Sequence, residues 1–329
     1  MKKLSFLLGI LISFFFLYLA FRGVNIAEVI KVIGSAKISY LMLALFTVLL
    51  GLIVRSYRWK IITSQYKNLP LKEFFQATNV GLMTNNVLPF RLGDIMQAYF
   101  LAYKNNLSKS TVLSTIVLER LFDLIFAGLL IICSSFFILL PRQIGRIRVI
   151  VFMSVICIMV FLIFRSKERF IGLVEKIAPS DKIRNNIKRL VENFYTGLHL
   201  VKDKKTFINA VLCTVVLWVV YVTTAYLCIL SFGLKLTIFG AVIIQCATAI
   251  SVIIPSSPGY IGTWEACLIL ALSIFGILKT QYLGFAMVSH FLSWLPVTVI
   301  GLFFFIKSGI SFKKIETQVE PQGQNSRNH

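Results

Sequence analysis

Charge is scarce in this sequence, and acidic charge is the scarcest. Only 14% of the 329 residues are charged, and Asp and Glu number 13 against 34 Lys and Arg. A water-soluble globular protein is excluded, because 57% of the residues are hydrophobic and the mean hydropathy is +0.84. The composition therefore predicts an integral membrane protein.

The few charges are mostly basic and give a formal net charge of +21. In a soluble protein this excess would suggest nucleic acid. Here the Lys and Arg residues lie mostly between apolar runs, where they set topology and face anionic lipid head groups. We expect membrane lipids with anionic or zwitterionic head groups as partners, and no nucleic acid.

Cysteine pairs and histidine clusters are also missing. The six cysteines all lie inside apolar runs without CxxC spacing, which is typical of small core residues. The three histidines are isolated from one another, so a zinc site is not expected. We expect no metal, no cofactor and no catalytic nucleophile.

Apolar runs long enough to cross a bilayer, about 20 residues each, predict an all-α polytopic membrane protein. The first run follows only Lys2 and Lys3 and lacks a cleavage site before a soluble domain, so we interpret it as a retained helix. The six candidate spans are residues 4–21, 39–56, 111–140, 149–164, 206–231 and 282–306.

Two further apolar regions, 74–103 and 237–278, are interrupted by proline and glycine. Each piece is too short to span comfortably, which favours two re-entrant helical hairpins. The motifs "PFRLGD" and "PSSPGYIGTWE" share proline, glycine and an acid, so we expect an inverted repeat. The residues that shape the breaks are Pro89, Gly93, Pro255, Pro258, Gly259 and Gly262.

Basic clusters predict the orientation. They follow the second span and fill residues 165–205, which places both regions and both termini on the cytoplasmic side of the inner membrane. Arg142, Arg146 and Arg148 argue against this scheme, but the larger clusters outweigh them.

We expect a first transmembrane half at 1–164, a basic amphipathic linker at 165–205, a second half at 206–307 and a disordered tail at 308–329. The linker either lies on the inner leaflet or is a solvated connector.

The stretch "TNNVLPFRLGD" concentrates polar groups within the first hairpin. A broken helix exposes backbone groups and a positive helix terminus, and Arg91 adds a cation that suits a phosphate. Its available partners are Asp94 and the cluster Glu119, Arg120 and Asp123, near mid-membrane in the third span. Two interpretations stay open: a structural salt bridge from Arg91 or Arg120 to Asp94, or a polar cavity for a head group that also uses Asn85 and Asn86.

The second hairpin contributes one acid, Glu265. Counting Arg91 and Arg120 against Asp94, Glu119, Asp123 and Glu265, the site has more acids than bases. It could hold a zwitterion, an ammonium beside a phosphate, or a protonated carboxylate coupled to transport.

Two other motifs are weaker candidates. "RSYRW" ends the second span, where Arg55, Arg58 and Trp59 either contact lipid phosphates or form an ordinary interfacial belt. His290, Trp294 and Pro296 are interpreted as packing residues and a kink.

In order and spacing, "RSYRW", "NNVLPFRLGD", "ERLFD" and "IPSSPGYIGTWEA" resemble the transmembrane flippase region of the lysylphosphatidylglycerol synthase family, over residues 4 to about 307. The resemblance implies a helical bundle with re-entrant hairpins that moves a lipid across the bilayer. In fused members it moves aminoacylated phosphatidylglycerol outward, which lowers susceptibility to cationic peptides. Stand-alone relatives are often suspected of moving other polar lipids, including polyprenyl-linked sugars.

This sequence departs from the family pattern in three respects. No aminoacyltransferase domain follows the last span, Asp94 stands where Glu is more common, and Gln97 stands where Arg is common. We therefore expect a flippase and not an enzyme. The alternatives are a lipid-modifying transferase, in which Asp94, Glu119 and Asp123 hold a divalent metal, or a partner subunit of a separately encoded synthase or glycosyltransferase.

Overall fold

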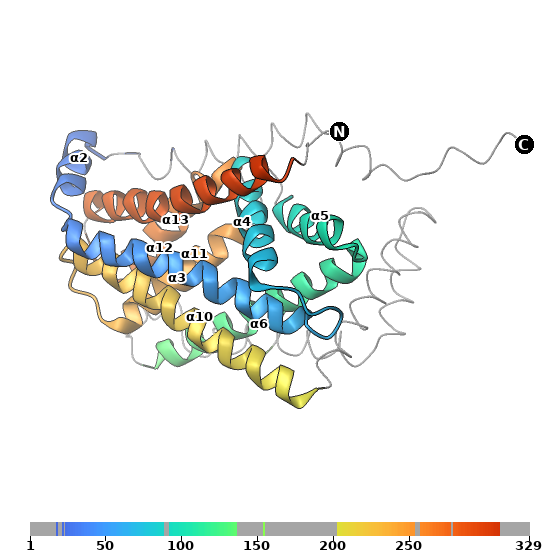
Figure 1. Ribbon diagram of the computed structural model, residues 1–329. Coiled ribbons are helices and arrows are strands. Elements are labelled where there is room, and N and C mark those ends of the chain that lie inside the picture. The colour runs from blue at the N-terminus through green and yellow to red at the C-terminus, as the bar shows by residue number, and fades with distance from the viewer. Residues whose placement is uncertain are drawn as a thin grey trace, which may run out of the picture.

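The computed structural model describes residues 24–88, 92–136, 203–253, 257–277 and 279–309, with Tyr18, Arg22 and Ser154 as isolated residues. All regular secondary structure in these stretches is helical, which confirms the all-α class (Figure 1). The helices are α2 (Ile26–Gly34), α3 (Ile38–Thr63), α4 (Leu71–Val87), α5 (Gly93–Asn105), α6 (Lys109–Ser135), α10 (Lys204–Ser231), α11 (Ile238–Ile253), η2 (Pro258–Tyr260), α12 (Thr263–Ser273) and α13 (Lys279–Lys307).

Three of the described helices are long and apolar enough to cross a membrane. They are α3, α10 and α13, and they match the spans expected at 39–56, 206–231 and 282–306. Helix α6 covers the described part of the span expected at 111–140, but its charged residues keep it outside this group. Apart from Tyr18 and Ser154, the spans expected at 4–21 and 149–164 lie outside the described residues, as does nearly all of the linker at 165–205 and of the tail at 308–329.

The first hairpin consists of α4 and α5, which pack against each other in opposite directions. Gly81 and Gly93 allow the close approach, because a Cβ built on Gly93 would overlap the backbone oxygen of Gly81. The side-chain oxygen of Asn85 accepts a hydrogen bond of 2.7 Å from the Gly93 N–H and so caps the start of α5. At the open end, Lys104 pairs with Glu73 at 3.0 Å. The break expected between residues 89 and 93 is therefore confirmed, although Pro89 itself lies outside the described residues.

The second hairpin runs from α11 through the short turn η2 to α12. Gly259 and Gly262 have φ angles of 72° and 90°, a region that residues with a Cβ rarely adopt. Space is also limited there, since a Cβ on Gly259 would lie 2.8 Å from Nε1 of Trp294 and 3.3 Å from the backbone oxygen of Asn86. The turn is thus wedged between α13 and the end of α4.

The two halves repeat one arrangement of four helices. Helix α3 packs on α4 as α10 packs on α11, and α5 packs on α6 as α12 packs on α13. The halves also exchange contacts, because α13 packs on α4 and α6 packs on α11. Gln76, Pro89 and Gly93 have the same mutual spacing as Gln245, Pro258 and Gly262. This repeat agrees with the expected one, while opposite membrane orientation of the halves stays a prediction.

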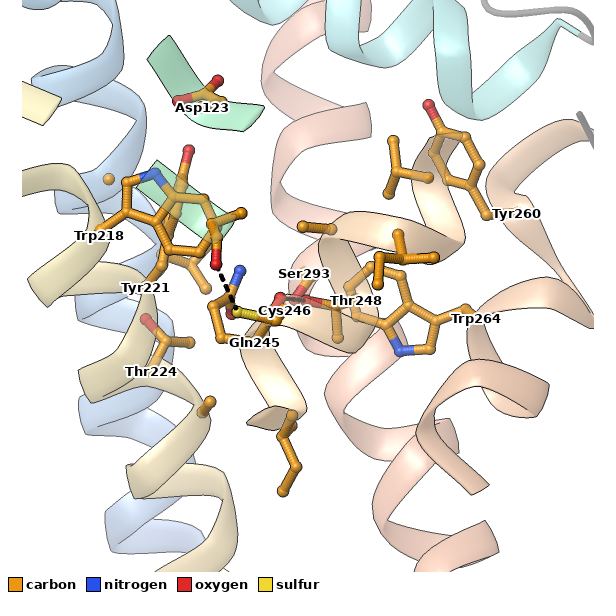
Figure 2. A pocket seen from close by; sticks show the side chains of 18 of the residues that line it. Asp123, Trp218, Tyr221, Thr224, Gln245, Cys246, Thr248, Tyr260, Trp264 and Ser293 are labelled. Carbon is orange, nitrogen blue, oxygen red and sulfur yellow. Dashed lines mark hydrogen bonds between the residues drawn. The ribbon is translucent and has the colours of Figure 1, made fainter. Parts of the chain in front are cut away.

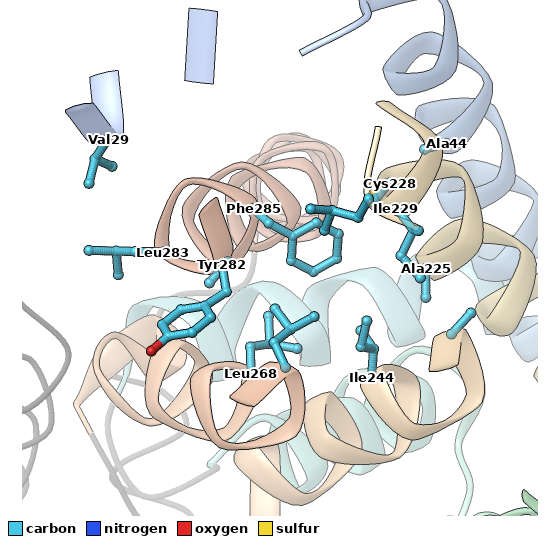
Figure 3. Close-up of a cluster of buried hydrophobic side chains, with 14 residues drawn as sticks. Val29, Ala44, Ala225, Cys228, Ile229, Ile244, Leu268, Tyr282, Leu283 and Phe285 are labelled. Atoms are coloured by element: carbon cyan, nitrogen blue, oxygen red, sulfur yellow. The ribbon is translucent and has the colours of Figure 1, made fainter. Parts of the chain in front are cut away.

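Helices α3 and α10 form the main contact between the halves and lie side by side in Figure 1. Gly51 admits the ring of Tyr221 at this crossing, and the hydroxyls of Thr47 and Thr224 lie 2.8 Å apart. An apolar core in the second half surrounds Leu268, Tyr282 and Phe285 (Figure 3). The crossing and the core together fix the walls of an internal cavity.

Candidate functional site: a cavity between the two halves

A cavity of about 570 Å³ lies where the two halves meet, with lining residues from α3, α4, α5, α6, α10, α11, η2, α12 and α13. Most of its wall is apolar, and polar side chains come from several of these helices. Figure 2 shows aromatic, hydroxyl and amide side chains from several helices around this space. They are Trp218, Tyr221, Thr224, Gln245, Thr248, Tyr260, Trp264 and Ser293.

The acids of α6 are held by an arginine from α3. The guanidinium of Arg58 donates to Glu119 at 3.1 Å and to both oxygens of Asp123, at 2.6 and 3.1 Å. Arg58 is fully buried, and Nη1 also lies 3.4 Å from the hydroxyl of Thr214. Glu119 and Asp123 share one face of α6, as their spacing of four predicts, so a single guanidinium can reach both.

Arg120 points to a different side of α6 and pairs with Asp94 at the start of α5, at 2.6 Å. Both side chains line the cavity and keep about a quarter of their surface exposed, 29% for Arg120 and 24% for Asp94. The salt bridge from Arg120 to Asp94, one of the two considered from the sequence, is present, while Arg91 lies outside the described residues. Because this pair is also part of the cavity wall, its structural role is compatible with contact to a ligand.

Arg55 stands out among the described residues because two of its three guanidinium nitrogens lack acceptors. Its Nε and Nη2 atoms are buried without a hydrogen-bond partner, although Arg55 lines the cavity one turn before Arg58. Nε of Arg120 and the indole nitrogens of Trp218 and Trp264 are likewise buried and unpaired. All of these atoms are donors, and buried donors without acceptors are costly. The wall therefore favours a ligand that brings acceptor oxygens.

The two asparagines have structural partners as well as a place in the cavity wall. Asn85 caps α5, and Asn86 donates to the hydroxyl of Thr298 at 2.8 Å and to the Trp294 carbonyl at 3.4 Å. The two contacts of Asn86 tie the first hairpin to α13 on either side of Pro296, the proline inside that helix.

Glu265 is engaged locally and is not a lining residue of the cavity. One carboxylate oxygen accepts from the Gly262 N–H at 2.7 Å, and the other lies 2.7 Å from Nδ1 of His290. Nε2 of His290 lies 2.8 Å from the Gly259 carbonyl. Glu265 therefore links the second hairpin to α13.

Several expectations need correction. Arg58 and Trp59 do not contact lipid at an interface, because both are fully buried within the bundle, and Trp59 donates to Thr115 at 2.9 Å. The count of charges at the site also changes, because Arg55 and Arg58 of α3 must be added to the bases that lie near the acids of α6. His290 makes specific polar contacts in addition to its packing. Arg91, Pro89 and Pro255 lie outside the described residues.

In the sequence, one signal for the missed arginines was their spacing. Arg55 and Arg58 are three residues apart, so they share a helical face. The interfacial interpretation missed that this face points inward, because only the packing of α3 against α6 and α10 reveals the direction.

Comparison with known proteins bears on the same arrangement. Residues 6–301 match the family model of the lysylphosphatidylglycerol synthase TM region. The chain belongs to this family. The resemblance drawn from the four ordered motifs is thus confirmed, and the chain is a multi-pass membrane protein.

Relatives within this family are similar along most of their length. A UPF0104 membrane protein of Methanocaldococcus jannaschii is 22% identical over 312 residues, which cover 89% of this chain and 91% of the relative. One from Pyrococcus horikoshii is 22% identical over 324 residues, which cover 92% of this chain and 96% of the relative. A second M. jannaschii protein is 27% identical over 231 residues, which cover 68% of this chain and 93% of the relative.

Proposed function

We propose that this protein translocates a polar lipid across the cytoplasmic membrane, with the head group passing through the cavity between the two halves. The observation that carries the proposal is the guanidinium of Arg55, buried in the cavity wall with two donors that have no acceptor. A lipid phosphate supplies the missing oxygens in the geometry that guanidinium prefers. The family membership and the broken hairpins support the same function.

Charge balance favours a head group that also carries a cation or a polar group. The described charges around the cavity are Arg55, Arg58 and Arg120 against Asp94, Glu119 and Asp123. Arg58 is occupied by two acids, while Asp94 and Asp123 keep part of their surface exposed. A zwitterionic or aminoacylated head group would place its phosphate at Arg55 and an ammonium near these acids, so that each charge has a counter-charge inside the membrane.

The apolar part of the wall accommodates the portion of the lipid next to the head group, while the acyl or prenyl chains remain in the bilayer. We place both chain termini on the cytoplasmic side, because basic residues occur from the last turn of α3 to the first turn of α4, at Lys60, Lys67 and Lys72. Membrane lipids are the proposed partners, and a separately encoded lipid synthase would supply the substrate.

The test measures lipid movement in liposomes that contain the purified protein. Fluorescent lysylphosphatidylglycerol, phosphatidylglycerol and a polyprenyl-phosphate sugar are compared, and a membrane-impermeant quencher reports each change of leaflet. One lipid should move in a protein-dependent way. Arg55→Ala should lower its rate by about tenfold or more, because a charge-assisted hydrogen bond contributes about 1.5–3 kcal/mol.

Two variants serve as controls for this measurement. Lys60→Ala removes a cation from the same helix outside the cavity lining and should leave the rate unchanged. Arg55→Lys keeps the charge but loses the planar pair of donors, so its rate should lie between those of the wild type and Arg55→Ala. If wild-type protein moves none of the three lipids, the translocator proposal is rejected in favour of an enzyme or a partner subunit.

A further inference from the structure

His290 and Glu265 form a buried acid–base pair that the proposed head-group site does not use. Nδ1 of His290 lies 2.7 Å from Oε1 of Glu265, with only 10% and 7% of the two side chains exposed. The ring of Trp264 stacks on the imidazole at 4.8 Å and an interplanar angle of 12°. The imidazole is therefore held in one orientation.

The contacts determine how many protons this pair carries. The Gly259 carbonyl can only accept, so Nε2 of His290 must carry a hydrogen. The second carboxylate oxygen already accepts from the Gly262 N–H. A further proton must lie between Nδ1 and Oε1, as imidazolium with carboxylate or as neutral imidazole with carboxylic acid. If that proton leaves to water, a lone pair of Nδ1 faces a carboxylate at 2.7 Å, and the contact is lost.

The repeat supplies a counterpart in the first half. There, Asp94 in the first turn of α5 pairs with Arg120 on α6. In the second half, Glu265 in the first turn of α12 pairs with His290 on α13. Each hairpin is thus attached to the long helix that follows it. Arginine stays protonated at all physiological pH values, whereas histidine titrates within that range.

The attachment in the second half supports part of the cavity wall. Gly259 and Gly262 flank Tyr260, and Glu265 follows Trp264; both aromatic residues line the cavity. Through Gly259 the same turn contacts the end of α4 and the indole of Trp294. Loss of the His290–Glu265 contact would free this turn beside the proposed head-group path.

Other titratable groups occur on the elements packed against α12 and α13. In the described residues, the polar side-chain contacts of Glu265 and His290 are those already given. The titratable side chains that these elements carry are Cys246 on α11, Tyr260 in η2, Cys267 on α12, Tyr282 and Lys307 on α13, Lys72 and Glu73 on α4, Glu28 and Lys31 on α2, Tyr40, Tyr57, Lys60 and the two arginines on α3, and Lys204, Lys205, Cys213, Tyr221, Tyr226 and Cys228 on α10.

We propose that His290 is the proton-binding residue that controls the second hairpin: the proton shared with Glu265 holds the turn at 257–262 closed against α13, and its release opens the turn. This regulation rests on the proposed translocation, in which the hairpin must move for a head group to pass. The first hairpin, attached by Arg120, has no such dependence on pH.

The test uses the full-length protein in lipid nanodiscs between pH 5 and 9. Hydrogen–deuterium exchange of residues 257–262 is corrected for intrinsic rates. As the pH rises toward the titration midpoint, it should become about tenfold faster per pH unit, because the open state binds one proton fewer. Imidazole ¹⁵N resonances of His290, in a His199→Gln and His329→Gln background, should titrate with the same midpoint. Lipid movement at equal pH on both sides should accelerate over the same interval.

Two substitutions at His290 have opposite expected effects. His290→Arg makes the attachment permanent, so exchange and lipid movement should be slow at every pH. His290→Gln removes the titration, so both should be fast at every pH. If the larger arginine side chain of His290→Arg prevents folding, Glu265→Gln is measured instead. It removes the carboxylate that shares the proton, so the pH dependence should again be abolished.

The outcomes separate this regulation from the translocation itself. Unchanged pH dependence in His290→Gln, or a His290 resonance that does not titrate between pH 5 and 9, overturns the proposal. If no lipid moves at any pH although exchange titrates with His290, translocation is rejected and the proton-dependent hairpin is retained.

Discussion

At the scale of single residues, burial of Arg58 determines the chemistry of the charged wall. Its guanidinium satisfies Glu119 and Asp123 at once, so these acids are compensated despite lying inside a membrane protein. Arg55, one turn away, lacks such a partner among the described residues. Two arginines on one helical face therefore differ in role, because Arg58 donates hydrogen bonds to the acids of α6 whereas Arg55 acts on them only through its charge.

Removing the Arg58 guanidinium should destabilise the fold. Arg58→Met leaves the buried Glu119 and the partly exposed Asp123 without their shared ion-pair partner, and breaking a buried ion pair costs about 3–5 kcal/mol. Thermal unfolding in detergent should show a clear loss. Adding Glu119→Gln and Asp123→Asn to Arg58→Met should restore most of the stability, because an uncharged set needs no counter-ion. A triple variant as unstable as the single one would contradict this account.

At the scale of elements, each hairpin depends on backbones that approach where glycine leaves room. Gly93 lies directly against Gly81 across the α4–α5 pair. In the second hairpin, Gly259 and Gly262 supply backbone conformations that a side chain would strain. The sequence signal, proline followed by glycine between two short apolar pieces, located both breaks because it reports local backbone chemistry.

Substitution at the first crossing should separate α4 from α5. Gly93→Ala places a methyl group into the backbone of Gly81, so the variant should unfold at a markedly lower temperature or fail to accumulate. Gly34→Ala is the matched control, because nothing lies within 4 Å of its added Cβ. Fluorescence-detected size exclusion of heated samples measures both. Equal melting temperatures for the two variants would show that the crossing tolerates separation.

At the scale of the whole molecule, two interfaces between the halves have different roles. The α3–α10 contact is extensive and is reinforced by Thr47 and Thr224. The contact between the first hairpin and α13 depends on Asn86 and Thr298, near the proton-dependent turn. We expect the first interface to remain fixed and the second to rearrange during translocation.

Reversible cross-links can distinguish the two interfaces. A disulfide between Thr47→Cys and Thr224→Cys should leave lipid movement nearly unchanged. One between Asn86→Cys and Thr298→Cys should abolish it until reductant is added, because the hairpin can no longer leave α13. The liposome assay measures both, with each reduced double variant as its own control. Full activity of the oxidised Asn86→Cys, Thr298→Cys protein would show that this interface stays closed.

The sequence by itself determined the membrane environment, the helical class, the family and the two broken hairpins. Composition, apolar run length and proline–glycine breaks are local properties of the chain. It also placed Asp94, Arg120 and Asp123 together in one site. Only the tertiary structure decided which charges neutralise one another and which donors face the cavity. Those outcomes depend on how α3, α6 and α10 are rotated against one another. Likewise, His290 became a partner of Glu265 only when α13 packed on α12, a contact between residues that no local pattern connects.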